Sequence, residues 1–232
     1  MKTIGILGGM SAASTQIYYR ELCRLARERL GGLHSPELLI RSLDFAVIER
    51  LQMQGDWDAA GTILNQEAKA LEHGGAELLI LATNTMHKLA DAMMEGVDIP
   101  FVHIADATAA AIVGQGFQRP GLMATAFTME QSFYTARLWA AGLTPVIPDA
   151  TDRVETHRII YDELCRDIVT PDSERSYVGI AGRLADAGAD CLILGCTEIG
   201  MLLNEGNVPV PVFDTVLEHC KAALSLAMEH TA

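Results

Sequence analysis

Short apolar runs alternate along the chain with longer segments whose apolar residues recur at helical spacing. The runs have the length of strands and contain few polar residues, which is typical of parallel strands buried on both faces. They fall at residues 3–7, 38–43, 77–82, 99–104, 119–125, 145–148, 190–195 and 210–214. Several of the helical segments between them stop at glycine, as at Gly31 and Gly142. The pattern predicts an α/β fold built on parallel sheets.

The second half of the chain repeats the order of the first. Residues 75–85 align with residues 188–198 without a gap, and Thr83 then falls opposite Cys196. Shared core composition can produce two similar segments, but the order of strands, small-residue turns and proline-led strands favours an internal repeat of roughly 110 residues. We therefore predict two similar αβα subdomains with parallel sheets related by pseudo-two-fold symmetry. The first would comprise residues 1–100 plus 212–232 and the second residues 101–211, with the active site in the cleft between them.

Charge and cysteine usage narrow the function classes. The 232 residues carry a formal net charge of −13 at pH 7, which argues against nucleic acid or an anionic membrane as the main partner. The five cysteines are scattered and odd in number, and the opening apolar stretch is too short for a secretory signal. We therefore expect free thiols in a cytoplasmic protein. No apolar run approaches the length of a membrane span.

One thiol stands apart from the other cysteines. Cys196 follows Gly195 at the end of a predicted strand, where open α/β sheets bind their ligands. A helix that begins just after it would favour the thiolate, which is the reactive form. The competing interpretation is a small buried hydrophobe, which we assign to Cys191 within the strand.

Hydroxyl and amide side chains follow two other predicted strands. Thr83, Asn84 and Thr85 occupy the position equivalent to Cys196, and Thr125 and Thr128 follow the first strand of the second half. Such residues often cap the next helix. They are also suited to hold a substrate carboxylate, because each side chain brings hydrogen-bond donors.

The common cofactor and metal motifs are missing. The first turn reads Gly5-x-x-Gly8-Gly9 rather than G-x-G-x-x-G, no Walker motif occurs, and the histidines show no metal-type spacing. The lone histidines are read as solvated or structural. The sequence thus predicts neither a metal nor an organic cofactor.

Three motifs together resemble the aspartate/glutamate racemase family over essentially the whole chain. They are Leu-Gly-Gly-Met after the first strand, Thr-Asn-Thr-Met-His after a mid-chain strand, and Gly-Cys-Thr-Glu after a late one. The resemblance implies racemisation of an acidic amino acid without a cofactor, with two cysteines flanking the substrate Cα. The family's first motif is typically Cys-Asn-Thr, so here Thr83 takes the place of the missing cysteine, while Cys196 is the second.

The resemblance implies an asymmetric enzyme. Cys196 as a thiolate would abstract the Cα proton of the L-enantiomer, and Thr83 would supply a proton on the opposite face. A threonine hydroxyl cannot act as a comparable standing base, so we expect the L-enantiomer of aspartate or glutamate to be preferred.

The same resemblance implies the other site residues and the assembly. Arg158 would reach the side-chain carboxylate, Glu198 would orient Cys196 or cap a helix, and the protein would form a homodimer. The remaining substrate-binding residues would be Met10, Ser11, Gln52, Asn84, Thr85, Thr125, Thr128 and Thr197. The alternatives are single-cysteine enolate chemistry, in a decarboxylase or a maleate-type cis–trans isomerase, and a non-catalytic protein that binds an acidic amino acid.

Overall fold

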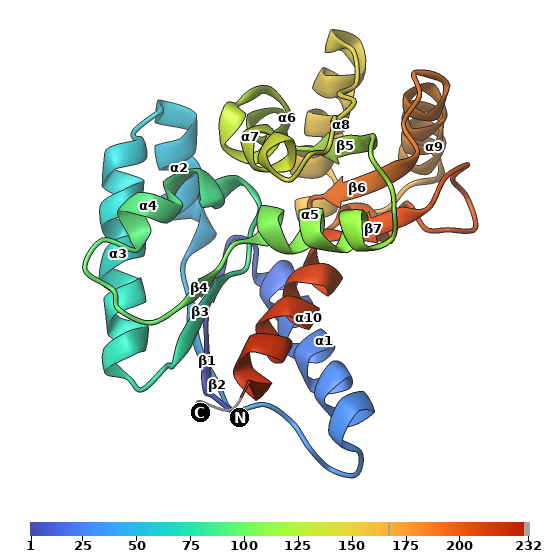
Figure 1. Ribbon diagram of the computed structural model, residues 1–232. Coiled ribbons are helices and arrows are strands. Elements are labelled where there is room, and N and C mark those ends of the chain that lie inside the picture. Colours follow the sequence, from blue (N-terminus) through green and yellow to red (C-terminus); the bar gives the residue numbers. More distant parts are fainter. Residues whose placement is uncertain (167, 230–232) are drawn as a thin grey trace. The chain divides into compact units, whose positions relative to one another are not determined.

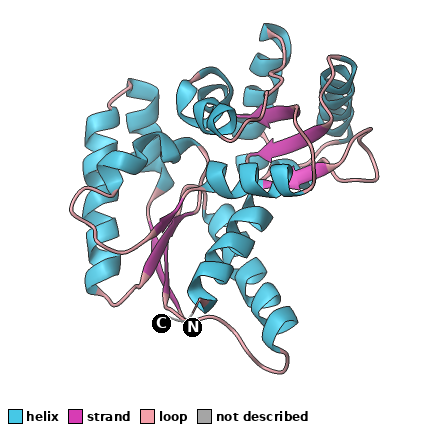
Figure 2. Cartoon of the chain, in the orientation of Figure 1, coloured by secondary structure: helices cyan, strands magenta, loops and turns pink. Residues whose placement is uncertain are grey.

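The computed structural model describes residues 1–166 and 168–229, and its chain divides into two compact units. The first unit comprises Met1–Ile104 together with the chain from His219 on, and the second comprises Ala105–Glu218. Each unit contains one parallel β-sheet with helices around it (Figures 1 and 2). The prediction of an α/β fold with two parallel sheets is confirmed.

The first unit is built on a four-stranded parallel sheet of order β2-β1-β3-β4. Its strands are β1 (Ile4–Gly8), β2 (Leu38–Ser42), β3 (Leu78–Leu81) and β4 (Phe101–Val102). Its helices are α1 (Ala12–Leu30), α2 (Phe45–Gln54), α3 (Trp57–His73), the 3-10 helix η1 (Thr85–Leu89), α4 (Ala90–Met93) and most of α10 (Thr215–Met228).

Helices cover both faces of this sheet. Alternate strand residues, among them Leu7, Leu79 and Leu81, pack against Leu64 and Leu71 of α3 in one buried cluster. Because side chains alternate across a strand, Ile6 and Ile80 point to the other face, where α1 and α10 lie in Figure 1. Burial on both faces explains the uninterrupted apolar runs of β1 and β3.

The second unit is built on a three-stranded parallel sheet of order β5-β6-β7. Its strands are β5 (Pro120–Ala124), β6 (Cys191–Gly195) and β7 (Val212–Asp214). Its helices are α5 (Ile104–Gly114), α6 (Ala126–Glu130), α7 (Ser132–Ala140), α8 (Ala150–Asp162), α9 (Pro171–Asp186) and the 3-10 helices η2 (Leu164–Arg166) and η3 (Ile199–Met201). Tyr177 and Ile180 of α9 and Ile159 of α8 form one buried cluster with Leu192 and Leu194 of β6.

The two sheets repeat the same pairing residue by residue. Leu7 pairs with Leu81 in the first sheet, and Met123 pairs with Leu194 at the equivalent place in the second. The glycine near the start of each leading strand is equivalent too. A Cβ on Gly5 would lie 2.6 Å from Leu79 Cδ2, and one on Gly121 would lie 2.8 Å from Leu192 Cδ2. Both strands therefore need glycine because a leucine of the neighbouring strand occupies the space.

One predicted strand differs from the structure. The run at 145–148 forms no strand and contributes an isolated bridge between Val146 and Gly121. The helical segment that stops at Gly142 is divided into two helices, α6 and α7, that meet at Gln131.

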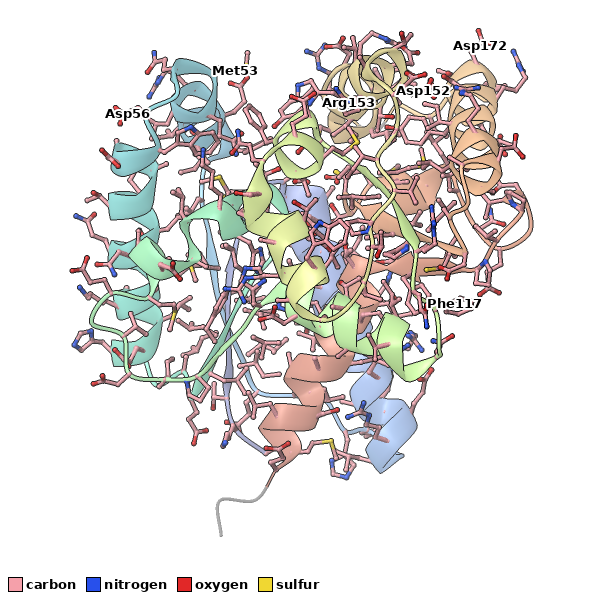
Figure 3. All side chains as sticks on the ribbon, turned by 45° about the horizontal axis from the view of Figure 1, so that its top comes forward. Met53, Asp56, Phe117, Asp152, Arg153 and Asp172 are labelled. Carbon is pink, nitrogen blue, oxygen red and sulfur yellow. The ribbon has the colours of Figure 1, made fainter. Side chains whose placement is uncertain are left out.

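Charged side chains on the helices form helix caps and ion pairs. Asp56 caps the start of α3 by accepting a hydrogen bond from the backbone N–H of Ala59. On α8, Asp152 pairs with Arg183, and Arg153 pairs with Glu130. Asp56, Asp152 and Arg153 are labelled in Figure 3. Among the described residues, no helix is both long and apolar enough to cross a membrane.

Candidate active site

In the first unit, the predicted site residues gather where β1 and β3 end. These strands are parallel neighbours, so their carboxyl ends lie side by side. The residues that follow them are buried, although most are polar. They are Met10, Ser11, Thr83, Asn84 and Thr85.

The turn after β1 is tied to the end of β3. Ser11 begins α1, with its hydroxyl oxygen accepting a hydrogen bond from the backbone N–H of Ser14. The hydroxyl of Ser14 donates to the carbonyl oxygen of Ala82 over 2.9 Å. Ser11 is the cap, and Ser14 instead fixes the chain next to Thr83.

Thr83 lies in a tight bend between β3 and η1. Its backbone N–H donates to the carbonyl oxygen of Leu81 over 2.9 Å, and its own carbonyl oxygen lies 2.7 Å from Nδ1 of His87. In the part of the chain that the structure describes, both hydrogen bonds of Thr83 are thus made by its backbone. The hydroxyl is not used to hold the bend.

Gln52 reaches this region from α2. Its side chain is buried, and its Nε2 atom lies 2.8 Å from the sulfur of Met86, three residues after Thr83. The structure therefore places Gln52 next to the segment that carries Thr83.

In the second unit, the predicted residues gather at the ends of β5 and β6. Ala124 and Gly195 are paired as the last residues of these strands, and Thr125 and Cys196 follow them directly. Thr125 caps α6, with its hydroxyl oxygen 3.4 Å from the backbone nitrogen of Thr128, and the two hydroxyl oxygens are 3.2 Å apart.

The thiol of Cys196 faces a carboxylate. Its sulfur donates a hydrogen bond to Oε2 of Glu198 over 3.0 Å, and the hydroxyl of Thr197 donates to the same oxygen. Burial raises the pKa of the Cys196 thiol, and the negative charge of Glu198 raises that pKa further. Both effects favour the protonated thiol over the thiolate.

The surroundings of Cys196 differ from those expected for a standing thiolate. A helix N-terminus after Cys196 was expected to stabilise the thiolate, but η3 spans only Ile199–Met201. Glu198 begins this 3-10 helix, and its side chain makes no capping hydrogen bond. Two roles were considered for Glu198, orienting Cys196 and capping a helix. Its side chain contacts Cys196 and does not cap the helix.

Replacing Glu198 with Gln is expected to lower the pKa of Cys196. The substitution removes a negative charge next to the sulfur, so the thiolate form costs less free energy. Burial remains, and the pKa stays above its ordinary value. Alkylation by iodoacetamide, followed at the Cys196 peptide by mass spectrometry, should therefore reach its half-maximal rate at lower pH in Glu198→Gln.

A matched variant separates this effect from a general change in charge. Glu205 lies on the exposed turn after η3, and Glu205→Gln removes the same charge at a greater distance along the chain. The profile of that variant should match the wild type. An unchanged or higher alkylation midpoint in Glu198→Gln would contradict the assigned cause.

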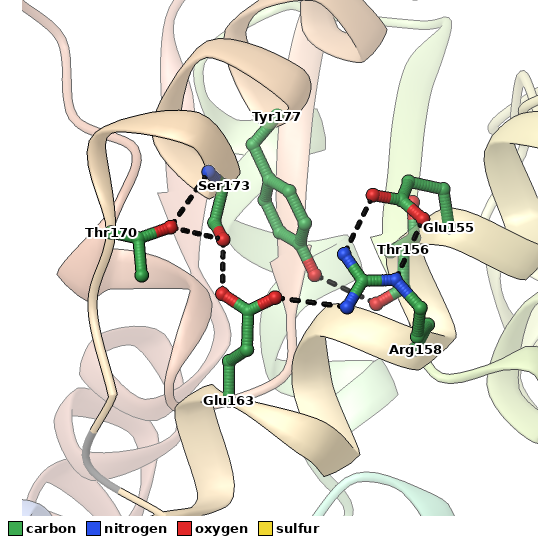
Figure 4. A network of polar contacts seen from close by, with 7 residues as sticks. All are labelled: Glu155, Thr156, Arg158, Glu163, Thr170, Ser173 and Tyr177. Atoms are coloured by element: carbon green, nitrogen blue, oxygen red, sulfur yellow. Dashed lines mark hydrogen bonds and ion pairs between the residues drawn. The ribbon is translucent and has the colours of Figure 1, made fainter.

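Arg158 is held in a network of charged side chains. On α8, its guanidinium makes two hydrogen bonds to Glu155, of 2.9 and 2.8 Å, and one of 3.0 Å to Glu163 (Figure 4). Glu163 also accepts a hydrogen bond from the hydroxyl of Ser173. In this structure two carboxylates of the protein contact its guanidinium, and a role of Arg158 at a substrate carboxylate stays a prediction.

The described residues were also compared with the requirements of a metal site. Within residues 1–166 and 168–229, no cluster of three or more His, Cys, Asp or Glu side chains is arranged to hold a metal ion.

One residue near the site was missed in the sequence. His87 is buried and contacts the backbone of Thr83, although the histidines were read as solvated or structural. The signal was its position in Thr-Asn-Thr-Met-His, one helical turn after Thr83.

Residues 7–223 match the profile of a family described as Asp/Glu/hydantoin racemase. Several solved structures are similar to this one over nearly the whole chain. A Yersinia pestis protein, provisionally assigned as an Asp/Glu racemase, is 44% identical with a TM-score of 0.92, over 99% of this chain and 100% of that one. An aspartate racemase homologue from Pyrococcus horikoshii OT3 is 36% identical with a TM-score of 0.86, over 99% and 100%. The aspartate racemase of Picrophilus torridus shares the fold at 22% identity, with a TM-score of 0.79 over 98% and 94%.

Proposed function

Since the chain belongs to the Asp/Glu/hydantoin racemase family, we propose that it racemises an acidic amino acid and prefers the L-enantiomer. In this proposal, Cys196 is the base for the L-enantiomer and Thr83 is the proton donor on the opposite face of Cα. No cofactor takes part. The observation that carries the proposal is the hydrogen bond between Cys196 and Glu198 at the end of β6.

The thiol and the carboxylate share one proton. In the resting pair the proton is on sulfur, and its transfer to Oε2 of Glu198 along the 3.0 Å hydrogen bond yields a thiolate next to a neutral acid. The charge of the pair is unchanged, so the thiolate forms without losing a proton to solvent. This is how a cysteine with a raised pKa becomes a base in a buried site.

The racemisation then proceeds in two proton transfers. The Cys196 thiolate takes the Cα proton, the C–H bond breaks, and its electron pair delocalises toward the α-carboxylate. Thr83 donates its hydroxyl proton to the other face of Cα and takes a proton from solvent. The pair has gained one proton, and this proton returns to solvent.

The hydroxyl of Thr83 makes proton removal from the two enantiomers unequal. A thiol has a reference pKa of about 8.5, whereas an aliphatic alcohol is a far weaker acid and is not ionised in water. Thr83 can protonate a strong carbanion, but it provides no standing base to remove the proton of the D-enantiomer. Exchange at Cα of the D-enantiomer is therefore slow. Inversion has the same kcat/KM in both directions, because the two enantiomers have the same free energy, and the step at Thr83 limits it.

Donors at the strand ends are proposed to bind the substrate carboxylates and stabilise the carbanion. Hydroxyl and amide groups suit both tasks, because they donate hydrogen bonds where negative charge develops. The residues proposed for this role are Met10, Ser11, Gln52, Asn84, Thr85, Thr125, Thr128 and Thr197. Aspartate is the first substrate to test, because the relative at 36% identity is described as an aspartate racemase homologue. A homodimer in the cytoplasm completes the proposal.

The test is deuterium incorporation at Cα in heavy water, measured by proton NMR for both enantiomers of aspartate and glutamate. We expect one L-amino acid to exchange at least about tenfold faster than its D-enantiomer, because only the face of Cys196 has a thiol base. Equal rates from both enantiomers would rule out the asymmetric mechanism.

A non-catalytic binder is the second candidate, and the raised pKa of Cys196 favours it. A protein of this kind would bind an acidic amino acid and leave Cα untouched. Saturable binding of aspartate in calorimetry, with no deuterium at Cα in either enantiomer, would select this function over racemisation.

A further inference from the structure

His87 connects the bend at Thr83 to Ile104, where the first of the two segments of the first unit ends. Its Nδ1 atom lies 2.7 Å from the carbonyl oxygen of Thr83, and its Nε2 atom lies 3.2 Å from the backbone nitrogen of Ile104. Both ring nitrogens are therefore engaged by backbone groups, one on each side of the ring.

These two partners determine the tautomer of His87. A backbone N–H can only donate, so Nε2 must accept from Ile104. A carbonyl oxygen can only accept, so Nδ1 must carry the hydrogen and donate it to Thr83. The neutral Nδ1–H form is the one that satisfies both contacts.

The surroundings hold the ring in place. His87 is 2% exposed and packs against the rings of Phe101, His103 and His219, with centroid distances of 5.5, 4.5 and 5.7 Å. His219 is itself fixed, with Nδ1 2.8 Å from the hydroxyl of Tyr18 and Nε2 2.7 Å from the carbonyl oxygen of Val102. The ring of His87 thus has little freedom to turn away from Thr83.

From these contacts we propose that His87 is a positioning residue, which holds the backbone of Thr83 so that its hydroxyl can reach the substrate. The inference rests on the proposed role of Thr83 as proton donor. The bend at Thr83 is otherwise closed by a contact between residues only two apart, Thr83 and Leu81. The Nδ1–H of His87 fixes the carbonyl side of the same residue.

Two substitutions separate the two contacts of the ring. In His87→Asn, the side-chain amide lies near the former Nδ1 position and can still donate to Thr83. In His87→Gln, the amide oxygen reaches the former Nε2 position and can accept from Ile104, while the bond to Thr83 is lost. The two variants remove one hydrogen bond each and differ in whether Thr83 is held.

The readout is the partition between inversion and exchange with L-aspartate in heavy water. Inversion needs Thr83, whereas exchange with retained configuration needs only Cys196. We expect the ratio of inversion to exchange to fall about tenfold in His87→Gln, the factor corresponding to one hydrogen bond, and to stay near the wild-type value in His87→Asn.

A matched histidine controls for the substitution itself. His73 is exposed near the end of α3, and its Nδ1 atom contacts the carbonyl oxygen of Lys69, also four residues earlier, over 2.7 Å. His73→Gln should leave the ratio unchanged. An unchanged ratio in His87→Gln, or an equal fall in His87→Asn and His87→Gln, would overturn the positioning role.

A second measurement does not depend on activity. Backbone amide exchange of the peptide that contains Thr83–Thr85, followed by mass spectrometry, should be faster in His87→Gln than in His87→Asn. If the wild type shows no Cα exchange but this difference is present, racemisation fails and the role of His87 in holding Thr83 stands. If the wild type racemises L-aspartate and both variants protect this peptide equally, the positioning role fails and the proposed function stands.

Discussion

Replacing Cys196 with Ala is expected to abolish deuterium incorporation at Cα of the L-substrate. In the proposed mechanism this thiol is the only base for that proton, and a positioned base contributes a factor on the order of 10³ to such a reaction. The loss should appear in kcat, because the thiol acts on the bound substrate. Proton NMR of L-aspartate in heavy water measures it directly.

The control is a thiol elsewhere in the chain. Cys23 lies half-buried on α1, and Cys23→Ala removes a sulfur of the same kind without touching the strand ends. That variant should keep its exchange rate. Full retention of exchange in Cys196→Ala would remove Cys196 from the mechanism, and the binding of aspartate to the inactive variant would show that its loss is chemical.

Replacing Thr83 with Cys is expected to raise turnover of the D-enantiomer by a factor on the order of 10². The substitution supplies a thiol where the repeat places the counterpart of Cys196, so both faces of Cα then have a base. Exchange at Cα of the L-enantiomer should change less, because Cys196 still removes that proton. Proton NMR in heavy water, started from each enantiomer, measures the two exchange rates separately.

Thr83→Ser is the matched variant for this prediction. It keeps a hydroxyl at the same position and removes only a methyl group, so the preference for the L-enantiomer should persist. A gain of D-turnover in Thr83→Ser comparable to that in Thr83→Cys would contradict the assignment of the asymmetry to the acidity of the side chain at position 83.

The repeat could be predicted from the sequence because the strands of both halves are visible as runs of apolar side chains. The buried runs of β1, β3, β5 and β6 are continuous, and the alignment of 75–85 with 188–198 corresponds to strand pairing of equal register. Thr83 and Cys196 could be proposed as site residues for the same reason. Each follows an apolar run of strand length that is visible in the sequence.

Contacts between polar groups are harder to predict in this way. The sequence suggested a substrate contact for Arg158 and did not single out Glu155 and Glu163, three and five residues away, as the partners of its guanidinium. The role of His87 depends on the backbone of Ile104, which is 17 residues away. No periodicity encodes such a pairing, because it arises only when the chain has folded.

The state of the Cys196 thiol is a similar case. A thiol before a helix suggests a lowered pKa, but the length of the helix and the direction of the Glu198 side chain decide the outcome. Both depend on local packing after the strand ends, and the sequence alone shows only that an acidic residue is near.

The place of Thr83 and Cys196 beyond the last paired residues of their strands bears on how such a protein can evolve. Leu81 and Gly195 close the hydrogen-bonded ladders, so the side chains that follow them are not needed to assemble either sheet. A duplicated half can therefore exchange a hydroxyl for a thiol at this position while its scaffold stays intact. The residues that determine the chemistry are next to, but distinct from, the residues that form the sheet. Selection can therefore change the first group while the second stays the same.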